Sequence, residues 1–460
     1  MELYPSQRLM KLFAASLTVL FATANLFGQN PLSKDSRVGI PPFEVDFAAF
    51  ADTAKGKSRL EVYYKLRNVG FSFVKKGSEY QAAYEVEVSL EGENGREVAS
   101  KHNSEEFAVP TYDQTQSLES YRLNAAHFSV KPGNYKIKIH LTDNNSKEIS
   151  SATRKAGVPD FTRGEVSVSN PLFIGAFADS ANLPLFKKEN RTVIPSVSRA
   201  FGDPDSLLHF YYEIYSRQPE PRAIRLEYEI TQRHHGMWTR QTDSLNLTAA
   251  KTPVFANLPV GKFPPGDYRL KLTVREGKKE LAKEEAEFKM NWNWEAALVY
   301  NFKDVVDLLR YFSRETDVEP LEKTPKEKRL EAWDKFWKDR DPTQATRENE
   351  AKKEFERRVR FADAYFSYMG LPGWKSDMGK IYIRYGEPDQ VDEDQSGLRN
   401  TNPFVAEDED RYTSNVTRIR QTGHSTQTWY YFSFRRAFSF EDVTGNGSWV
   451  LRPPFDGRRF

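Results

Sequence analysis

The stretch Phe47-Ala-Ala-Phe-Ala-Asp-Thr-Ala54 reappears later in the chain as Ile174-Gly-Ala-Phe-Ala-Asp-Ser-Ala181. Two runs of alternating apolar and polar or charged residues then follow each copy in the same order. In the first copy the apolar positions are Leu60, Val62, Tyr64 and Leu66, then Tyr84, Val86, Val88 and Leu90; in the second they are Leu208, Phe210, Tyr212 and Ile214, then Ile224, Leu226, Tyr228 and Ile230. Alternation at a period of two is typical of a half-buried strand.

The same turn sequence precedes the last alternating run of both copies. Pro132-Gly133-Asn134-Tyr135 opens the last alternating run of the first copy, and Pro265-Gly266-Asp267-Tyr268 opens that of the second. Proline fixes φ and glycine accepts a positive φ, so both tetrapeptides favour a turn. The ordered matches predict a duplicated domain, with copies at 36–162 and 163–292 and loops of different length. Short strands separated by Gly/Pro turns predict β-sandwiches of immunoglobulin or fibronectin type.

The apolar period becomes helical after the second copy. Leu298, Phe302, Val305, Leu309 and Phe312 form one stripe, which predicts a first helix. A second helix is expected from Thr324-Pro325, and a third after Thr346. Alternation at Ile381, Ile383 and Tyr385 predicts a strand, 391–426 reads as a long polar loop, and strand patterns return at 428–434, 437–440 and 448–451. Residues 296–460 are therefore expected to form an α+β domain in which a helical segment leads into an antiparallel sheet.

The segment from Leu371 to Asp389 resembles the defining motif of the GWxTD family, with further matches that extend the resemblance over about 330–452. The residues that carry the motif are Gly373, Trp374, Ser376, Asp377, Gly379, Tyr385, Gly386, Pro388 and Asp389. Serine stands at 376 where the family has threonine, so a hydroxyl is retained. The resemblance implies an exported bacterial protein, and the family has no established reaction to carry over.

Two interpretations of this motif remain open at the level of sequence. In the architectural one, Gly373 allows a sharp exit from a helix, Trp374 anchors the fold, and Ser376 or Asp377 accepts backbone N–H groups in a turn. In the other, an exposed Trp374 and Asp377 bind a partner. The architectural interpretation is favoured because the motif lies between a helix end and a predicted strand.

The N-terminus has the pattern of a secretory signal. Arg8 and Lys11 precede an apolar run over 12–27, which predicts a signal peptide at 1–28 and a periplasmic or extracellular location. No later segment is long and apolar enough to predict a transmembrane span. The chain has no cysteine, which excludes a lipid anchor at a cleavage-site cysteine and any disulfide.

Charge and motif content argue against several classes of function. The 67 Lys+Arg and 65 Asp+Glu nearly cancel and are interspersed, unlike the basic face of a nucleic-acid-binding protein. No zinc-protease or phosphate-loop signature is present, and the calcium-like start at Asp392 has Pro403 where a bidentate glutamate is needed. The sequence thus predicts no catalytic, metal-binding or cofactor-binding residues and no cofactor, although weak calcium binding by the acidic loop stays open.

Three functions remain as hypotheses. The leading one is a noncatalytic interaction or structural protein of the bacterial cell envelope, with an unidentified protein or envelope polymer as partner. The second is an envelope hydrolase that acts on peptide or glycan through carboxylates of the 387–410 loop. The third is a carbohydrate-binding protein that uses exposed tryptophan or tyrosine side chains.

Overall fold

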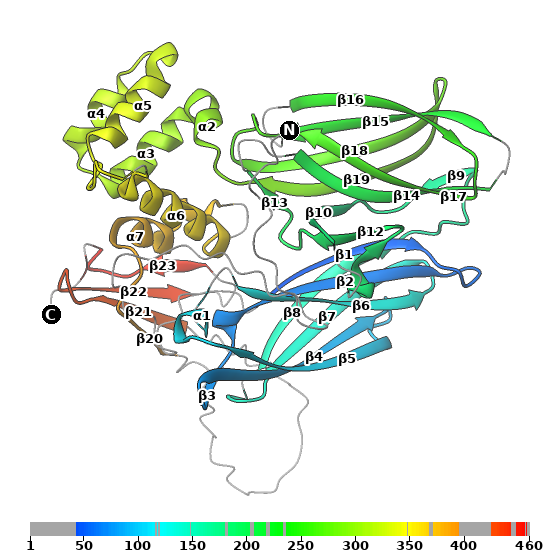
Figure 1. Cartoon of the computed structure of the whole chain (residues 1–460), viewed down its shortest axis with the longest axis horizontal. Coiled ribbons are helices and arrows are strands. Elements are labelled where there is room, and N and C mark those ends of the chain that lie inside the picture. Colours follow the sequence, from blue (N-terminus) through cyan, green and yellow to red (C-terminus); the bar gives the residue numbers. More distant parts are fainter. Residues whose placement is uncertain are drawn as a thin grey trace, which may run out of the picture. The chain divides into compact units, whose positions relative to one another are not determined.

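A computed structural model gives the structure of the chain (Figure 1). It describes residues 43–115, 117, 120–147, 149–179, 183–202, 207–217, 221–232, 236–346, 348–367, 371–394, 425–442, 448–455 and 457. The predicted signal peptide at 1–28 therefore lies outside the described residues. The chain divides into two compact units, the first ending at Tyr300 and the second beginning at Asn301.

The first copy of the repeat is built from two antiparallel sheets. One has the order β1-β2-β6, and the other has the order β3-β4-β7-β8, with β5 paired to β4. The bounds are β1 Phe43–Ala51, β2 Ser58–Arg67, β3 Val74–Lys76, β4 Glu79–Glu91, β5 Glu97–Val109, β6 Tyr121–Val130, β7 Gly133–Asp143 and β8 Ile149–Val158. A short helix, α1 (Tyr112–Thr115), and the 3₁₀ turn η2 (Asn68–Gly70) complete it.

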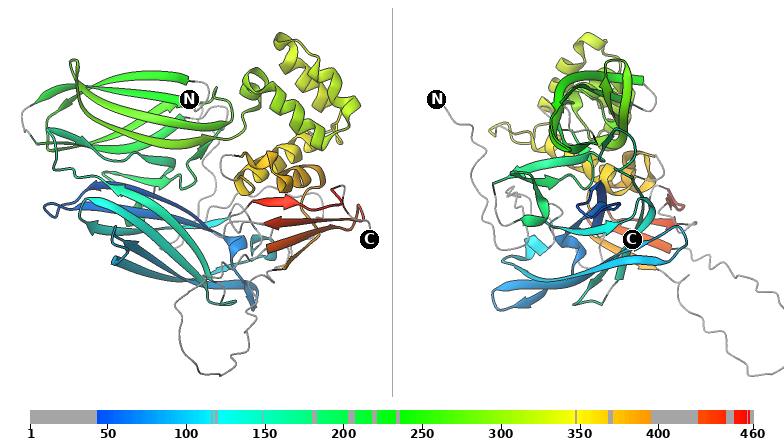
Figure 2. Two further views of the ribbon diagram at one scale, coloured as in Figure 1. Left: turned by 180° about the vertical axis from the view of Figure 1, so that it is seen from behind. Right: turned by 90° about the vertical axis from the view of Figure 1, so that its right-hand side faces the viewer.

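The second copy repeats this strand order. Figure 2 shows the ribbon from two further sides. Strands β10-β14-β17 correspond to β1-β2-β6, and β16-β15-β18-β19 correspond to β5-β4-β7-β8. The bounds are β9 Val166–Val168, β10 Leu172–Ala178, β11 Lys187–Lys188, β12 Arg191–Pro195, β13 Ala200–Phe201, β14 Leu207–Ser216, β15 Arg222–Gln232, β16 Gly236–Leu247, β17 Lys251–Pro259, β18 Gly266–Glu276 and β19 Lys279–Met290. The shared order supports the predicted duplication, and the mainly β fold class is confirmed.

The Pro-Gly turn that precedes the last long hairpin forms the same hydrogen bond in each copy. The Tyr135 hydroxyl donates to the carbonyl of Lys131 at 2.7 Å, and the Tyr268 hydroxyl donates to the carbonyl of Pro264 at 2.8 Å. A tyrosine that bonds back to the backbone a few residues upstream is a hallmark of immunoglobulin-like sandwiches. Both tyrosines open equivalent strands, β7 and β18.

The duplication offers a matched pair of substitutions. Tyr268 is 2% exposed and Tyr135 is half-buried. We expect Tyr268→Phe to cost about 1 kcal/mol because a buried carbonyl loses its donor, and Tyr135→Phe to cost less, since water can replace the exposed bond. Chemical denaturation of each variant measures the difference. Equal losses would show that the two turns do not differ in solvation.

Each sandwich has its own core between its two sheets. In the first, residues such as Val62, Tyr84 and Ile139 are 0–1% exposed, and in the second Phe210 and Leu272 are 0% exposed. These are the positions at which the alternating pattern predicts inward-facing side chains. The hydrophobic effect of burying them is the main favourable term in folding.

A third cluster of apolar residues joins the two sandwiches. It combines side chains of β1, β2 and β6 with side chains of β10, β12 and β14 and their connections, so the outer faces of two sheets are also buried. Its members are Ala48, Phe50, Tyr63, Leu123, Leu172, Ile174, Ala178, Leu183, Phe186, Val193, Ile194, Val197 and Tyr211. The two sandwiches thus form one compact unit.

Charged side chains cross the same junction. Lys188 Nζ lies 2.6 Å from Glu61 Oε2, with side chains 4% and 2% exposed. Arg199 Nε donates to both carboxylate oxygens of Asp46 at 2.9 Å. Glu61 was expected on the charged, outward side of a half-buried strand. That expectation is wrong, because the outer face of β2 is covered by the second sandwich.

The helices of the C-terminal third differ in detail from the prediction. The expected single stripe is split at Asn301 into α2 and α3, and Asn301 leaves the helical conformation with φ −123° and ψ 34°. The Asn301 side chain makes no capping hydrogen bond, so the break is seen in the backbone conformation alone. The bounds are α2 Trp294–Tyr300, α3 Phe302–Phe312, α4 Glu315–Glu322, α5 Arg329–Lys338, α6 Glu350–Tyr365 and α7 Asp377–Tyr385, with 3₁₀ turns η3 Pro184–Phe186, η4 Lys326–Lys328 and η5 Gly373–Lys375.

The helix start predicted at Thr324-Pro325 is also wrong, because α5 begins at Arg329. The Thr324 hydroxyl donates to the carbonyl of Pro320 at the end of α4, a helix that the sequence analysis missed, and η4 leads into α5. The third predicted helix is α6, whose N-cap is Asn349, with Oδ1 accepting from the N–H of Lys352 at 2.9 Å. None of the described helices combines the length and apolar character needed to cross a bilayer.

The strand predicted at 381–385 is a helix instead. Ile381, Ile383 and Tyr385 lie on α7, which begins at the N-cap Ser376. Met378, Ile381, Tyr382 and Tyr385 also fall at helical spacing, so both periods fit, and the cap decides in favour of the helix.

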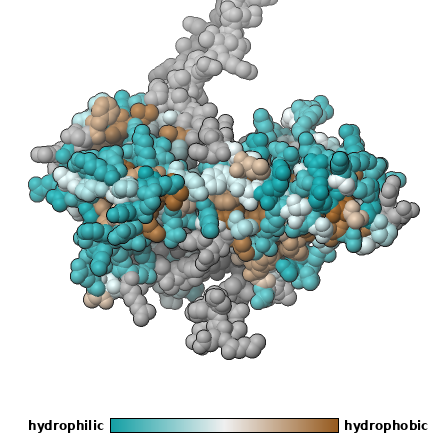
Figure 3. Space-filling view, turned by 90° about the horizontal axis from the view of Figure 1, so that it is seen from above, coloured by the Kyte–Doolittle hydropathy of each residue, from teal (hydrophilic) through white to brown (hydrophobic). Residues whose placement is uncertain are grey.

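The sheet of this unit has the order β20-β21-β22-β23, all antiparallel. The bounds are β20 Gln390–Asp394, β21 Ser425–Tyr431, β22 Arg436–Asp442 and β23 Trp449–Leu451. The beginning of the predicted long loop is therefore strand β20, while the rest of that loop, 395–424, lies outside the described residues. The surface seen in Figure 3 is mostly hydrophilic, with apolar residues exposed in small groups.

Candidate functional site

The motif residues lie at the junction of α6, η5 and α7. Gly373 has no room for a side chain, since a Cβ atom there would lie 1.8 Å from the carbonyl oxygen of Ala362 on α6. A Cβ at Gly379 would lie 1.9 Å from the carbonyl oxygen of Gly373. The two glycines therefore let α6, η5 and α7 approach at backbone contact. Sequence reasoning predicted a helix exit at Gly373 but not this close packing.

Trp374 is held at the same junction. Its side chain is 3% exposed, and its backbone N–H donates to Asp363 Oδ1 at 3.1 Å. Asp363 is itself buried on α6. The expectation of an anchoring tryptophan fits this position, and a partner would not reach an indole that is buried to this degree. Asp363 was not singled out from the sequence, because an aspartate in a helical run gives no signal of its own.

Ser376 and Asp377 fix the start of α7. The Ser376 hydroxyl donates to the carbonyl of Gly373 at 2.6 Å and accepts from the N–H of Gly379 at 3.0 Å. Asp377 Oδ2 accepts from the N–H of Leu451 on β23 at 3.1 Å, and its Oδ1 lies 3.1 Å from Lys380 Nζ. The serine caps the helix, and the aspartate ties it to the sheet.

The departure from the family motif at 376 can be tested. Ser376→Ala should cost about 1 kcal/mol through loss of the N-cap. Ser376→Thr keeps the hydroxyl and should stay within about 0.5 kcal/mol of the native free energy of unfolding, since threonine also caps helices. Thermal unfolding of the two variants measures both losses of stability. A threonine variant as unstable as the alanine variant would contradict the capping role.

The second half of the motif joins α7 to the sheet. Gly386 has a φ of +82°, which glycine adopts readily, and its carbonyl accepts from the Tyr431 hydroxyl at 3.0 Å. Asp389 Oδ2 accepts from the N–H of Phe432 at 2.6 Å, while Pro388 is buried. Tyr385 packs its ring against Tyr431 and Phe438 of the sheet and against Phe434 in the turn between β21 and β22.

Two arginines that the sequence analysis did not single out complete the junction. Arg358 Nη1 donates to the carbonyls of Ile383 and Arg384 at 3.1 and 3.2 Å, which satisfies the C-terminal end of α7. Arg357 Nη1 donates to the Tyr382 hydroxyl at 3.1 Å. Both arginines also pair with Glu354 at 2.7 Å. Their role could only be found from the contact between α6 and α7.

One carboxyl in this region is electrostatically unusual. Burial raises the pKa of Glu387, Arg357 only partly offsets that effect, and the charge of Glu354 adds to it. For Glu354 the balance is reversed. Burial would raise its pKa, but the hydrogen bonds and charges of Arg357 and Arg358 outweigh burial and lower it. A desolvated carboxyl beside a paired one is a pattern of functional sites as well as of structural ion-pair networks.

We expect Glu387→Gln to stabilise this unit at neutral pH. The folded-state pKa is raised, so the carboxyl favours folding at low pH, and this contribution is lost as the pH rises through the folded pKa. Glutamine carries no charge and should gain stability relative to glutamate above that point, with the gain vanishing in acid. Urea unfolding at pH 4 and pH 8 measures this. A variant that is less stable at pH 8 would show that the ionised carboxylate is well solvated or paired.

The described residues include no group of three or more His, Asp or Glu side chains placed to hold a metal ion. The acidic loop proposed as a weak calcium site lies mostly in 395–424, outside the described residues.

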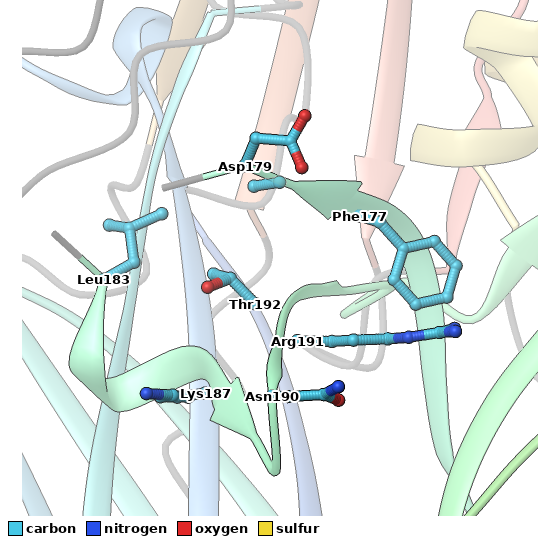
Figure 4. A pocket seen from close by; sticks show the side chains of 8 residues that line it. Phe177, Asp179, Leu183, Lys187, Asn190, Arg191 and Thr192 are labelled. Atoms are coloured by element: carbon cyan, nitrogen blue, oxygen red, sulfur yellow. The ribbon is translucent and has the colours of Figure 1, made fainter. Parts of the chain in front are cut away.

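A cavity of about 510 Å³ lies in the second sandwich (Figure 4). It is lined by Phe177, Ala178, Asp179, Leu183, Lys187, Asn190, Arg191 and Thr192. These residues come from the end of β10, the segment that leads to η3, and the β11–β12 hairpin. The sequence analysis names none of them as site residues, because 177–179 belong to the repeated stretch and the hairpin has no counterpart in the first copy.

Taken together, the strand orders and the motif define a protein of two stacked β-sandwiches followed by an α+β domain. Residues 290–440 match the family model of the GWxTD domain, so the C-terminal part of the chain is a GWxTD domain and the resemblance is confirmed. The match begins earlier than the predicted 330 and includes α2 and α3. No curated protein sequence matches the chain significantly.

Solved structures give only distant similarities. Red sea bream transglutaminase is 8% identical with a TM-score of 0.18, covering 54% of this chain and 32% of the enzyme. A glycosyl hydrolase family 2 member from Bacteroides cellulosilyticus is 10% identical with a TM-score of 0.21, covering 54% and 36%. A β-glucuronidase from Bacteroides uniformis is 10% identical with a TM-score of 0.20, covering 49% and 26%. The chain thus spans about a third or less of these proteins, and overlaps this weak carry no functional argument.

Proposed function

We propose that the chain is an exported, noncatalytic interaction or structural protein of the bacterial cell envelope. The observation that carries this proposal is the junction between the two sandwiches, where Lys188 pairs with Glu61 and Arg199 with Asp46 beneath a shared apolar cluster. A fixed double sandwich suits a spacer or a binding scaffold better than a flexible tether. The GWxTD motif supports the same proposal, because its side chains are engaged in holding α6, α7 and the sheet together.

The envelope location rests on the sequence. Arg8 and Lys11 before the apolar run are typical of a secretory signal, and the absence of cysteine in a chain of this length agrees with stability through packing alone. The proposed partner is a protein or an envelope polymer. The proposal includes no nucleic acid and no lipid anchor.

Two measurements test location and partner separately. N-terminal sequencing of the protein from its native host should begin between Asn25 and Asn30. Affinity capture with the tagged chain without 1–28 should enrich a specific partner from envelope extract in every repeat of the experiment. Cytosolic extract is the matched control and should not yield this partner. A protein that retains Met1 in the cytosol would contradict export, and capture without any envelope-specific partner would contradict the interaction function.

A second candidate, the envelope hydrolase, is favoured by one observation only. Glu387 lies in the 387–410 segment and has a raised pKa, which a general acid requires. Hydrolysis of envelope glycan or peptide by the native chain, abolished in the folded Glu387→Gln variant, would establish it. Unchanged hydrolysis in that variant would assign the activity elsewhere.

A further inference from the structure

The second sandwich carries a segment that the first one lacks. The connection between β1 and β2 runs only from Asp52 to Lys57, whereas the equivalent connection between β10 and β14 runs from 179 to 206 and contains η3, β11 and β12. Lys188 of this segment faces the first sandwich. Its neighbour Lys187 lines the cavity on the second. The longer connection therefore both joins the sandwiches and builds the cavity.

The Arg191 side chain contacts two aromatic rings, and its N–H donors have no partner among the described residues. Its guanidinium carbon lies 4.9 Å from the ring centre of Phe255 and 5.6 Å from that of Phe177. Within the described part of the chain it forms no ion pair or side-chain hydrogen bond. A guanidinium has five N–H donors in a planar fork that matches a carboxylate. The two ring centres are 6.4 Å apart, so the guanidinium lies to one side of an aromatic pair and contacts both rings.

Lys187 and Asn190 add further donors at the same cavity. Both are exposed, and neither side chain pairs with another described residue. Among the described lining residues Asp179 is the one carboxylate, and in Figure 4 its carboxylate points away from the Arg191 guanidinium. In the hairpin register Lys187 is opposite Thr192 and Lys188 is opposite Arg191, so Lys187 and Arg191 lie on opposite faces, and Figure 4 shows Asn190 on the side of Arg191.

Phe177 provides an apolar surface beside these donors. Its side chain is 44% exposed, although it also contacts Phe255 and His209. An aromatic ring that keeps this much exposure can stack on the C–H face of a sugar ring, while hydroxyl and carboxylate groups reach the polar donors. The cavity volume lies in the range of small-ligand sites, about 300–1,000 Å³.

We propose that this cavity binds a sugar residue that carries a carboxylate, as part of an acidic polysaccharide or oligosaccharide. Arg191 binds the carboxylate, Asn190 donates to a ring hydroxyl, and Phe177 stacks on the ring. The inference deepens the proposed function by giving the noncatalytic scaffold a ligand, and it rests on that function only for the assumption that the sugar is bound and not cleaved. It is independent of the partner of the GWxTD domain.

The test is isothermal titration calorimetry on the full chain without 1–28, at low salt, with trigalacturonate as probe. Its methyl ester is the matched control ligand, because the shape is kept and the charge is removed. We expect the acid to bind about tenfold more tightly than the ester, as the loss of a charge-assisted hydrogen bond predicts. Equal binding of the two, or no binding of the acid, would overturn the proposal. Competition by sodium sulfate at equal concentration would show that the cavity accepts any anion and would also overturn it.

Variants locate the binding. Arg191→Gln should weaken binding of the acid about tenfold, and Phe177→Leu about threefold to tenfold. Lys57→Gln, in the short connection of the first sandwich, is the control and should leave affinity unchanged. Melting temperatures equal to that of the native chain would show that the variants are folded. Binding that survives both cavity variants would place the sugar elsewhere and refute the assignment. Capture of an envelope partner has a different readout, so either proposal can fail alone.

Discussion

Gly373→Ala should abolish the cooperative unfolding transition of the C-terminal unit. The new Cβ would lie 1.8 Å from the Ala362 carbonyl oxygen and 2.6 Å from its carbon, both backbone atoms inside α6. Overpacking usually costs about 1–3 kcal/mol because side chains can move aside. Here no side chain can yield, so α6 and η5 must separate, and we expect a loss of about 4–5 kcal/mol. That is a large share of the 5–15 kcal/mol that stabilises a typical domain.

Limited proteolysis of the full chain shows which of the two units loses its resistance to cleavage. Cleavage should move into 301–460, while 43–300 stays protected. Gly175→Ala is the matched control, because its Cβ would meet only atoms at 3.6 Å or more on the exposed side of β10, and it should leave both units intact. A Gly373→Ala protein with native protease resistance would mean that α6 and η5 are not in backbone contact.

The sandwiches could be predicted from the sequence because their signals are local. Alternation at Leu60, Val62 and Tyr64 depends only on the strand period, and the Pro-Gly turn before Tyr135 and Tyr268 carries its own chemistry. Duplication then doubled the evidence. The order of the strands within each sheet could not be predicted, because pairing between strands distant in the sequence leaves no local signal.

Helix α7 could not be predicted with the same security. Ile381, Ile383 and Tyr385 satisfy a period of two, while Met378, Ile381 and Tyr382 satisfy the helical period, and the segment is too short for either to dominate. The structure resolves this through Ser376, whose hydroxyl satisfies the N–H of Gly379. The cap was predicted as a turn contact and not as a helix start.

The junction between the sandwiches was invisible for a different reason. Glu61 alternates with Leu60 and Val62 as a solvent-facing residue would, and Lys188 lies in a segment without a repeat. Nothing local shows that the two charges meet across more than a hundred residues. The cavity could not be predicted for the same reason, because Arg191 contacts Phe177 and Phe255 only in the folded chain.

Lys188→Met should destabilise the double sandwich by about 3 kcal/mol. The substitution keeps an unbranched apolar side chain but leaves Glu61, 2% exposed, without its closest cation. Removing one partner of a buried ion pair costs about 3–5 kcal/mol. The lower end applies, because Arg59 Nε remains 2.8 Å from Glu61 and the Tyr63 hydroxyl still donates to it. Lys187→Gln, one residue away and exposed, should stay within about 0.5 kcal/mol.

A double-mutant cycle separates the charge effect from packing. Glu61→Gln combined with Lys188→Met should recover about 2 kcal/mol relative to Lys188→Met alone, since no buried charge remains uncompensated. If the two losses simply add, the pair does not stabilise the junction and the apolar cluster alone holds it.

The pH dependence gives an independent check with a definite sign. Burial would raise the pKa of Glu61, but Lys188, His127 and the Tyr63 hydroxyl outweigh it and keep that pKa below the usual 4.5. A depressed carboxyl pKa contributes stability that is present above the unfolded-state value and is lost as the pH falls through the folded-state value. The difference in free energy of unfolding between the native chain and Lys188→Met should therefore be largest above pH 4.5 and shrink in acid. A difference that stays constant as the pH falls would mean that Glu61 is already protonated in the native junction, and the ion pair would then be replaced by a neutral hydrogen bond.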